Sequence, residues 1–141
     1  MQVETILQSK GRAVHTVSAD TTLAEAVAML TERRIGAVVV LEGKKVVGIL
    51  SERDIVRHLG EDWAALASRP VRDVMTSAVV TTGRYATVGE VMEQMTERRI
   101  RHLPVVEGGE LVGIVSIGDV VKRKIEETEQ EADALKQYIA S

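Results

Sequence analysis

The chain has 141 residues, of which 45% are apolar and only 2% aromatic, with no cysteine and no phenylalanine. The lack of cysteine excludes disulfide bonds, thiol catalysis and cysteine-ligated zinc. The formal net charge is −3, but residues 126–141 hold five acidic residues against Lys136, so the rest of the chain is close to neutral. Nucleic-acid binding is not expected, because it needs a strongly basic face.

The apolar residues also limit where the protein can reside and how its core can be built. The longest purely apolar run, Ala37–Leu41, is far too short to span a bilayer, and no charged N-terminal segment precedes an apolar stretch. We expect a soluble cytoplasmic protein without a membrane partner. One folded unit is expected, with a core of Val, Ile, Leu, Ala and Met.

An internal repeat organises the chain. The segment Thr31–Ile35 returns as Thr96–Ile100, which places the second copy 65 residues after the first. The same offset relates Glu42-Gly43 to Glu107-Gly108, Val47-Gly48-Ile49 to Val112-Gly113-Ile114, and Ser51-x-x-Asp54 to Ser116-x-x-Asp119. Two copies are too few for an open solenoid, so the pattern indicates two sub-domains related by a pseudo-two-fold axis.

The elements of each copy follow in chain order. Thr22 and Thr87 each precede a glutamate by three residues and begin an apolar pattern with helical spacing, which predicts a capped helix. The arginine pairs at 33–34 and 98–99 fall at the helix ends, where the helix dipole already favours cations.

A β-hairpin is predicted after each of these helices. The strands are expected at 37–41 and 46–50 in the first copy and at 103–106 and 111–115 in the second. Ser51 and Ser116 then cap a second helix. Each copy therefore reads strand, helix, strand, strand, helix, and a short helix around Trp63–Ala67 is expected before Pro70.

These elements define five segments. We expect an N-terminal helical segment at 1–10, a first repeat at 11–60, a linker with a short helix at 61–75, a second repeat at 76–125 and a C-terminal amphipathic helix at 126–141.

The tandem units, the Ser-x-x-Asp turns and the segment Arg101–Val106 together resemble a pair of CBS domains, or Bateman module, over about residues 7–125. The chain is also similar to stand-alone bacterial and archaeal CBS pairs, with Lys10-Gly11 before the first copy and a charged helix after the second. The resemblance implies an α+β fold in which two pseudo-symmetric β-α-β-β-α repeats pack through their sheets, followed by a C-terminal helix.

The resemblance also implies a function. It indicates a non-enzymatic regulatory module for energy sensing that binds an adenosine-containing ligand, with AMP first and ADP, ATP, NAD(H) or S-adenosylmethionine-type compounds as alternatives. Carboxylates at Asp54 and Asp119 can accept from the ribose hydroxyls. Ser51 and Ser116, at helix starts, suit a phosphate. The adenine nucleotide is the ligand, and no separate cofactor is expected.

Two ligand clefts follow from the resemblance. Cleft A comprises Ala13, His15, Ile35, Gly36, Ala37, Arg101, His102, Ile114, Ser116 and Asp119. Cleft B comprises Ile49, Ser51, Asp54, Ala78, Val80, Ile100, Arg101 and His102. We favour cleft A, because Gly118 next to Asp119 leaves space that Arg53 takes next to Asp54.

Several of these residues also have simpler, structural interpretations. A Ser-x-x-Asp motif is by itself a helix cap. Gly48 and Gly113 suit either close ligand approach or tight sheet packing. The three histidines lack metal-ligand spacing, so no metal is expected. No Ser-His-Asp set, phosphate loop or Gly-x-Gly-x-x-Gly motif occurs, so no catalytic residue is expected.

The C-terminal helix carries a narrow apolar seam, formed by Ile125, Thr128, Ala132, Leu135 and Ile139. A seam with this spacing needs a partner helix. By analogy with CBS pairs, the partner is a second copy in a homodimer, or the helix folds back on its own module. The competing function is a ligand-independent adaptor for an unidentified protein partner, and loss of Asp119 distinguishes adaptor from sensor.

Overall fold

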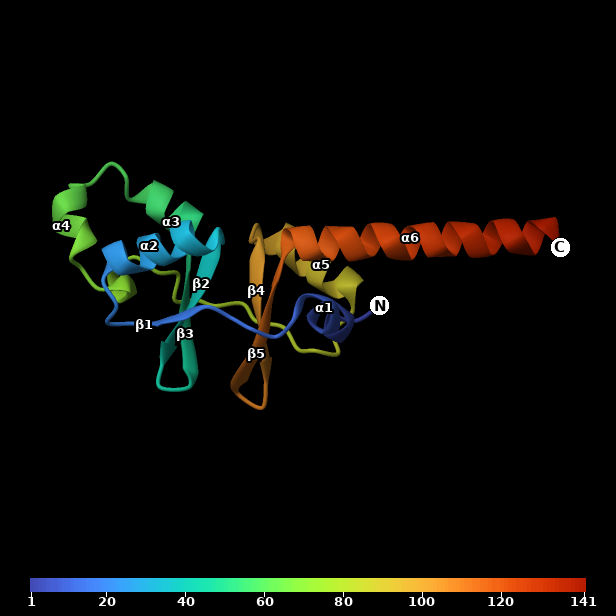
Figure 1. Ribbon diagram of the computed structural model, residues 1–141, viewed down its shortest axis with the longest axis horizontal. Coiled ribbons are helices and arrows are strands. Elements are labelled where there is room, and N and C mark those ends of the chain that lie inside the picture. The colour runs from blue at the N-terminus through green and yellow to red at the C-terminus, as the bar shows by residue number, and fades with distance from the viewer. The chain divides into compact units, whose positions relative to one another are not determined.

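A computed structural model describes residues 1–141 and has the α+β elements that the repeat predicts (Figure 1). In order these are α1 (Val3–Lys10), β1 (Thr16–Ser18), α2 (Leu23–Arg33), β2 (Ala37–Glu42), β3 (Lys45–Ser51), α3 (Glu52–Arg57), α4 (Trp63–Ala67), the 3-10 helix η1 (Val71–Asp73), α5 (Val88–Arg98), β4 (His102–Glu107), β5 (Glu110–Ser116) and α6 (Ile117–Ala140). Both hairpins and the short helix at Trp63–Ala67 are confirmed. None of the helices is long and apolar enough to cross a membrane.

The chain forms two compact units. One contains Ala13–Val80 and Gly108–Leu111, and the other contains Met1–Arg12, Thr81–Glu107 and Val112–Ser141. The segment that precedes the first repeat in the sequence therefore folds with the second repeat. The linker that follows the first repeat folds with the first.

The unit of residues 13–80 is built on a three-stranded sheet in the order β1-β2-β3. Strand β1 pairs with β2 in parallel, and β2 pairs with β3 antiparallel. The β-branched run Val38–Val40 is fully buried, as expected for a strand covered on both faces. Its core contains only aliphatic residues, namely Val17, Ala19, Leu23, Ala26, Leu30, Val38, Val40, Leu50, Leu66, Val71 and Val74.

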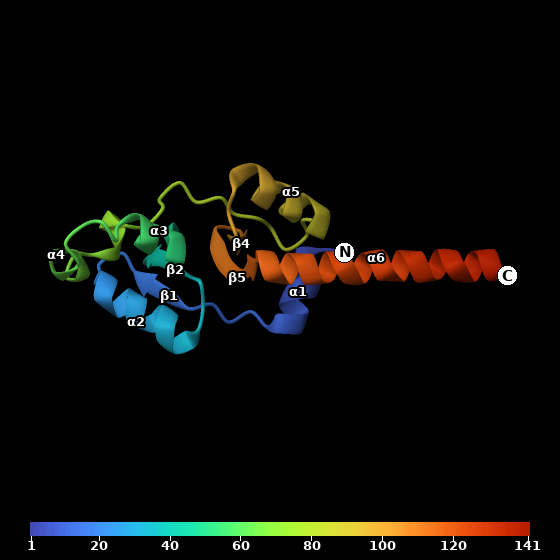
Figure 2. The same ribbon diagram turned by 90° about the horizontal axis from the view of Figure 1, so that it is seen from above.

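The other unit combines the β4-β5 hairpin with helices α1, α5 and α6. Figure 1 and Figure 2 show α1 and α5 beside the first turns of α6, and both helices contact it. The buried side chains come from all of these elements: Val3, Ile6, Leu7, Val88, Val91, Met95, Leu103, Val105, Val115 and Val120. The prediction of a core without aromatic residues is confirmed in both units.

The first strand of the second repeat is reduced to an isolated bridge. Thr82 pairs in parallel with Val105, in the register that joins Val17 to Val40 in the first repeat. In the first repeat the backbone N–H of Val39 donates to the carbonyl of His15 at 3.4 Å. Pro104 occupies the position equivalent to Val39 and has no N–H to donate, so the ladder is shorter there.

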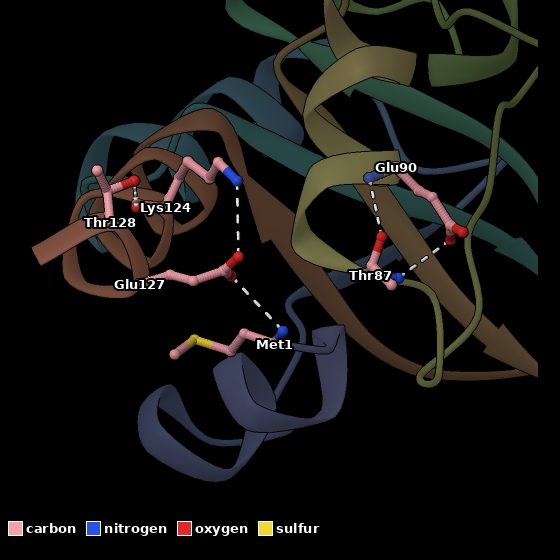
Figure 3. Close-up of polar contacts among 6 residues, drawn as sticks. All are labelled: Met1, Thr87, Glu90, Lys124, Glu127 and Thr128. Atoms are coloured by element: carbon pink, nitrogen blue, oxygen red, sulfur yellow. Dashed lines mark hydrogen bonds and ion pairs between the residues drawn. The ribbon is translucent and has the colours of Figure 1, made fainter. Parts of the chain in front are cut away.

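The helix starts follow the capping signals. Thr87 and Glu90 form a complete capping box: the hydroxyl accepts from the Glu90 amide and the carboxylate accepts from the Thr87 amide, each at 3.1 Å (Figure 3). The hydroxyl of Thr22 accepts from the Glu25 amide at 3.2 Å. Both predicted helix starts are confirmed.

Helix α6 runs without a break from the second repeat into the C-terminal segment. Glu127 contacts the N-terminal amino group of Met1 at 3.5 Å and Lys124 at 3.6 Å, which ties this part of the helix to the start of the chain (Figure 3). Residues 128–141 are exposed. The C-terminal half of α6 therefore has no cover from its own chain.

Candidate functional site

The Ser-x-x-Asp motif forms the same turn in both repeats, at the junction of the last strand and the following helix. In the second repeat the amide of Ser116 donates to Asp119 Oδ2 at 2.9 Å, and the Ser116 hydroxyl accepts from the Asp119 amide at 3.2 Å. These reciprocal bonds are a capping box at the start of α6. The motif therefore caps a helix, as the simpler interpretation predicts.

The carboxylate of Asp119 has one further partner, Lys10 at the end of α1. Lys10 Nζ donates to Asp119 Oδ2 at 2.8 Å and to the carbonyl of Ile114 at 3.1 Å. Burial raises the pKa of Asp119, but the hydrogen bonds from Lys10 and Ser116 and the Lys10 charge lower it by more, so the pKa lies below that of an ordinary aspartate. Asp119 is therefore a stable anion in the neutral range.

The equivalent carboxylate of the first repeat, Asp54, is more deeply enclosed. Its Oδ2 accepts from the amide of Ser51 at 2.9 Å and from the Ser51 hydroxyl at 3.1 Å. Its Oδ1 accepts from the hydroxyl of Thr76 at 2.8 Å, and Arg57 lies 3.8 Å away. The side chain of Asp54 is only 5% exposed, whereas that of Asp119 is 25% exposed.

Lys10 and Thr76 reach the two turns from matching places in the sequence. Gly11 and Thr76 are one repeat length apart, so each repeat is preceded by a segment that packs against the turn of the other repeat. Sequence reasoning missed both side chains as members of the site. The 65-residue offset gave no signal here, because residues 7–12 and 72–77 share no residue type at that offset.

The structure places the predicted cleft residues in two groups, one in each unit. Ile100, Arg101, His102, Ile114, Ser116 and Asp119 belong to one unit, and the carbonyl of Arg101 accepts from the amide of Ile117 at 2.8 Å. That bond holds the start of β4 beside the start of α6.

The remaining ten predicted residues belong to the unit of residues 13–80: Ala13, His15, Ile35, Gly36, Ala37, Ile49, Ser51, Asp54, Ala78 and Val80. Ala37 pairs with Ser51 across the hairpin, and the carbonyl of Gly36 accepts from the amide of Glu52 at 3.0 Å. Ile49 exchanges two backbone hydrogen bonds with Thr76. These contacts gather the start of β2, the Ser-x-x-Asp turn and Thr76 at one edge of the sheet, while Ala13 lies ahead of β1 and Ala78 follows Thr76.

Packing accounts for both strand glycines. A Cβ atom on Gly48 would lie 2.3 Å from Met75 Sδ, and one on Gly113 would lie 2.6 Å from Leu7 Cδ2. Both distances are shorter than side-chain contacts allow. Of the two interpretations, tight packing is the one that the structure supports.

The structure contains no group of three or more His, Cys, Asp or Glu side chains that could hold a metal ion. His58 contacts the carbonyl of Asp54 through Nδ1 at 2.8 Å, one turn earlier along the chain. This contact gives His58 a local role at the end of α3.

The fold and the two turns define a class of protein: a tandem pair of α+β repeats, each ending in a polar turn at a helix start. The sequence profile of the CBS domain matches residues 10–61 and 71–126, and the chain therefore belongs to the CBS domain family.

Similar proteins agree with this assignment. A CBS-domain-containing protein of Agrobacterium tumefaciens is 44% identical, with a TM-score of 0.83 over 87% of this chain and 92% of that one. The mitochondrial CBS domain-containing protein CBSX3 of Arabidopsis thaliana is 33% identical over 97% of this chain and 71% of its own length. The CBS domain pair of protein MJ0100, solved in complex with 5′-methylthioadenosine and S-adenosyl-L-methionine, is 25% identical, with a TM-score of 0.78 over 90% of this chain and 98% of that one.

Proposed function

We propose that this CBS pair is a non-enzymatic sensor that binds an adenosine-containing ligand at the Ser-x-x-Asp turns, with AMP as the first candidate. The observation that carries the proposal is the Asp119 turn, which holds an ionised, partly exposed carboxylate beside a hydroxyl at a helix start. The carboxylate suits the two ribose hydroxyls. The ligands of the MJ0100 pair both contain adenosine, which supports the same ligand class here.

Asp119 is the stronger candidate of the two carboxylates. Asp54 accepts hydrogen bonds from three protein donors and is almost fully covered. The hydrogen bonds to Asp119 all reach Oδ2, and its neighbour Gly118 has no side chain to obstruct an approaching ligand. Arg101 and His102, which belong to the same unit as Asp119, are proposed to provide positive charge for a phosphate.

Lys10 offers a route from ligand binding to a change in the protein. A ribose that hydrogen-bonds to Asp119 alters the partners of Lys10, and Lys10 ends α1, which contacts α6. Lys10 then has two arrangements, one bonded to Asp119 and one released from it. A ligand that binds more tightly to the released arrangement shifts the equilibrium toward it. We propose that occupancy is signalled in this way, through α1 and α6 or through a change in a homodimer in the cytoplasm.

The test is thermal unfolding of the purified protein with AMP, ADP, ATP, NADH and S-adenosylmethionine in turn, followed by calorimetric titration of any compound that acts. A ligand at a hundred times its dissociation constant stabilises by about 2.7 kcal/mol. Asp119→Asn, which keeps the shape of the side chain, should abolish the shift for the active compound. Asp54→Asn is the matched control and should retain most of it.

The competing function, a ligand-independent adaptor, is favoured by the exposed C-terminal half of α6. If none of the five compounds shifts the unfolding temperature of the wild-type protein, the sensor proposal is rejected. If a compound acts equally on both variants, binding occurs away from the Asp119 turn.

A further inference from the structure

The C-terminal half of α6 is an apolar stripe without a partner. Leu135 is 59% exposed and Ile139 is 74% exposed, and Ile125 at the start of the stripe is 54% exposed. Figure 1 shows this half of the helix extending past α1 and α5 of its own unit. The fold-back of this helix that the sequence left open is therefore not observed.

The spacing of the stripe determines what kind of partner fits it. Ile125, Ala132 and Ile139 take the a positions of a heptad repeat, and Thr128 and Leu135 take the d positions. A stripe made only of a and d positions is the narrow seam of a coiled coil, which pairs with one other helix. Among parallel coiled coils, isoleucine at a with leucine at d favours two strands over three or four, and Ile125, Ile139 and Leu135 follow this pattern.

The charges beside the seam identify a second copy of this chain as the partner. Lys124 and Glu131 take g positions, and Glu129 and Lys136 take e positions. In a parallel pair each g residue faces the e residue five positions later on the other helix. Lys124 then faces Glu129 and Glu131 faces Lys136, so all four flanking pairs of a symmetric dimer join opposite charges.

An antiparallel pair fits less well. Its layers join a positions to d positions, so Ile125 would meet Leu135 and Ile139 would meet Val121, but Glu129 and Glu131 would then each lie near the same glutamate of the other helix. From these charges we infer that two copies of the chain pair through a parallel coiled coil of α6 from Ile125 to Ile139. The inference does not depend on whether the turns bind a nucleotide.

Disulfide trapping tests the pairing directly, because the chain has no native cysteine. Two heptads make a short coiled coil, so the pairing is expected to depend on concentration, and trapping detects even a partly populated dimer. Under mild oxidation Ile139→Cys should form a covalent dimer, because the two introduced thiols lie at the same level of a parallel pair. Gln137→Cys, on the outer face of the same turn, is the matched control. Equal crosslinking rates for the two variants would overturn the inference.

Charge exchange then tests the direction. In the Ile139→Cys background, Glu131→Lys alone or Lys136→Glu alone turns two attractive pairs into repulsive ones and should slow crosslinking by about tenfold. The double variant restores opposite charges and should recover the original rate. A mixture of the two single variants should give mainly mixed dimers. These residues are exposed, and circular dichroism should show unchanged helix content. A double variant as slow as either single variant would overturn the parallel arrangement.

Discussion

The two Ser-x-x-Asp turns share a serine, an aspartate and the backbone of a helix start, but they differ in what surrounds the carboxylate. Asp54 is enclosed and accepts from three protein donors, the last of which is the neutral hydroxyl of Thr76. Asp119 is a quarter exposed and accepts from the amide of Ser116 and from the charged Lys10. Duplication therefore preserved the turn, while the segment that packs against each turn gave the two carboxylates different environments.

The same motif can therefore serve two purposes in one chain. A buried carboxylate whose hydrogen bonds are satisfied contributes mainly to stability, because its removal leaves buried donors without an acceptor. A partly exposed carboxylate held by a single flexible cation can exchange that partner for a ligand. The following predictions test this contrast between the repeats.

The largest effect is expected at the enclosed turn. Asp54→Ala leaves the amide and hydroxyl of Ser51 and the hydroxyl of Thr76 without their acceptor, and should lower the free energy of unfolding by about 3 kcal/mol. Asp119→Ala removes a helix cap and an exposed ion pair and should cost about 1 kcal/mol. Urea denaturation of both variants measures the difference. Equal losses would contradict the contrast between the turns.

A second effect concerns the two strand glycines, Gly113 and Gly48. They pack against Leu7 and Met75, which lie in the segments that precede the two repeats. Gly113→Ala should cost about 2 kcal/mol, because the added methyl group overlaps Leu7, a fully buried side chain of α1. Gly48→Ala should cost less, because Met75 is flexible and only partly buried.

Combining Gly113→Ala with Leu7→Ala gives the control for this explanation. The double variant should lose less stability than the sum of the single variants, since the smaller side chain makes room for the new methyl group. Strict additivity would show that Leu7 is not the residue that excludes a side chain at position 113.

Local signals explain how much of this fold could be predicted from the sequence. The repeat offset, the capping residues and the β-branched runs predicted the helices and hairpins, because each depends on residues a few positions apart. The shortened strand pairing at Pro104 could not be predicted in this way. It depends on which backbone N–H groups of the neighbouring strand donate to the first strand of the repeat, and that pairing is long-range. Lys10 was not predicted as a site residue for the same reason, because its partner Asp119 is 109 residues away in the sequence.

A smaller effect should be alike in the two repeats. The helices α2 and α5 both end at an arginine in the left-handed conformation, Arg34 with φ 52° and Arg99 with φ 54°. This conformation is strained for a residue with a Cβ atom and unstrained for glycine. Arg34→Gly should therefore raise the free energy of unfolding by about 0.5 kcal/mol. The matched control, Arg33→Gly, changes the last residue of α2 and should lower the free energy of unfolding by up to about 1 kcal/mol.

The smallest effect isolates Lys10 through pH. Because the folded-state pKa of Asp119 is lowered, its ion pair contributes stability above the ordinary aspartate pKa of about 3.9, and this contribution is lost as the pH falls through the lowered value. For an exposed pair it is about 0.5 kcal/mol. The stability difference between wild type and Lys10→Gln should therefore be constant from pH 7 to about pH 5 and shrink below about pH 4. Carboxyl-carbon NMR titration should give Asp119 a higher pKa in Lys10→Gln than in wild type. An unchanged pKa would mean that Lys10 does not hold this carboxylate in solution, and a hydrogen bond from a charged side chain would no longer distinguish the two turns.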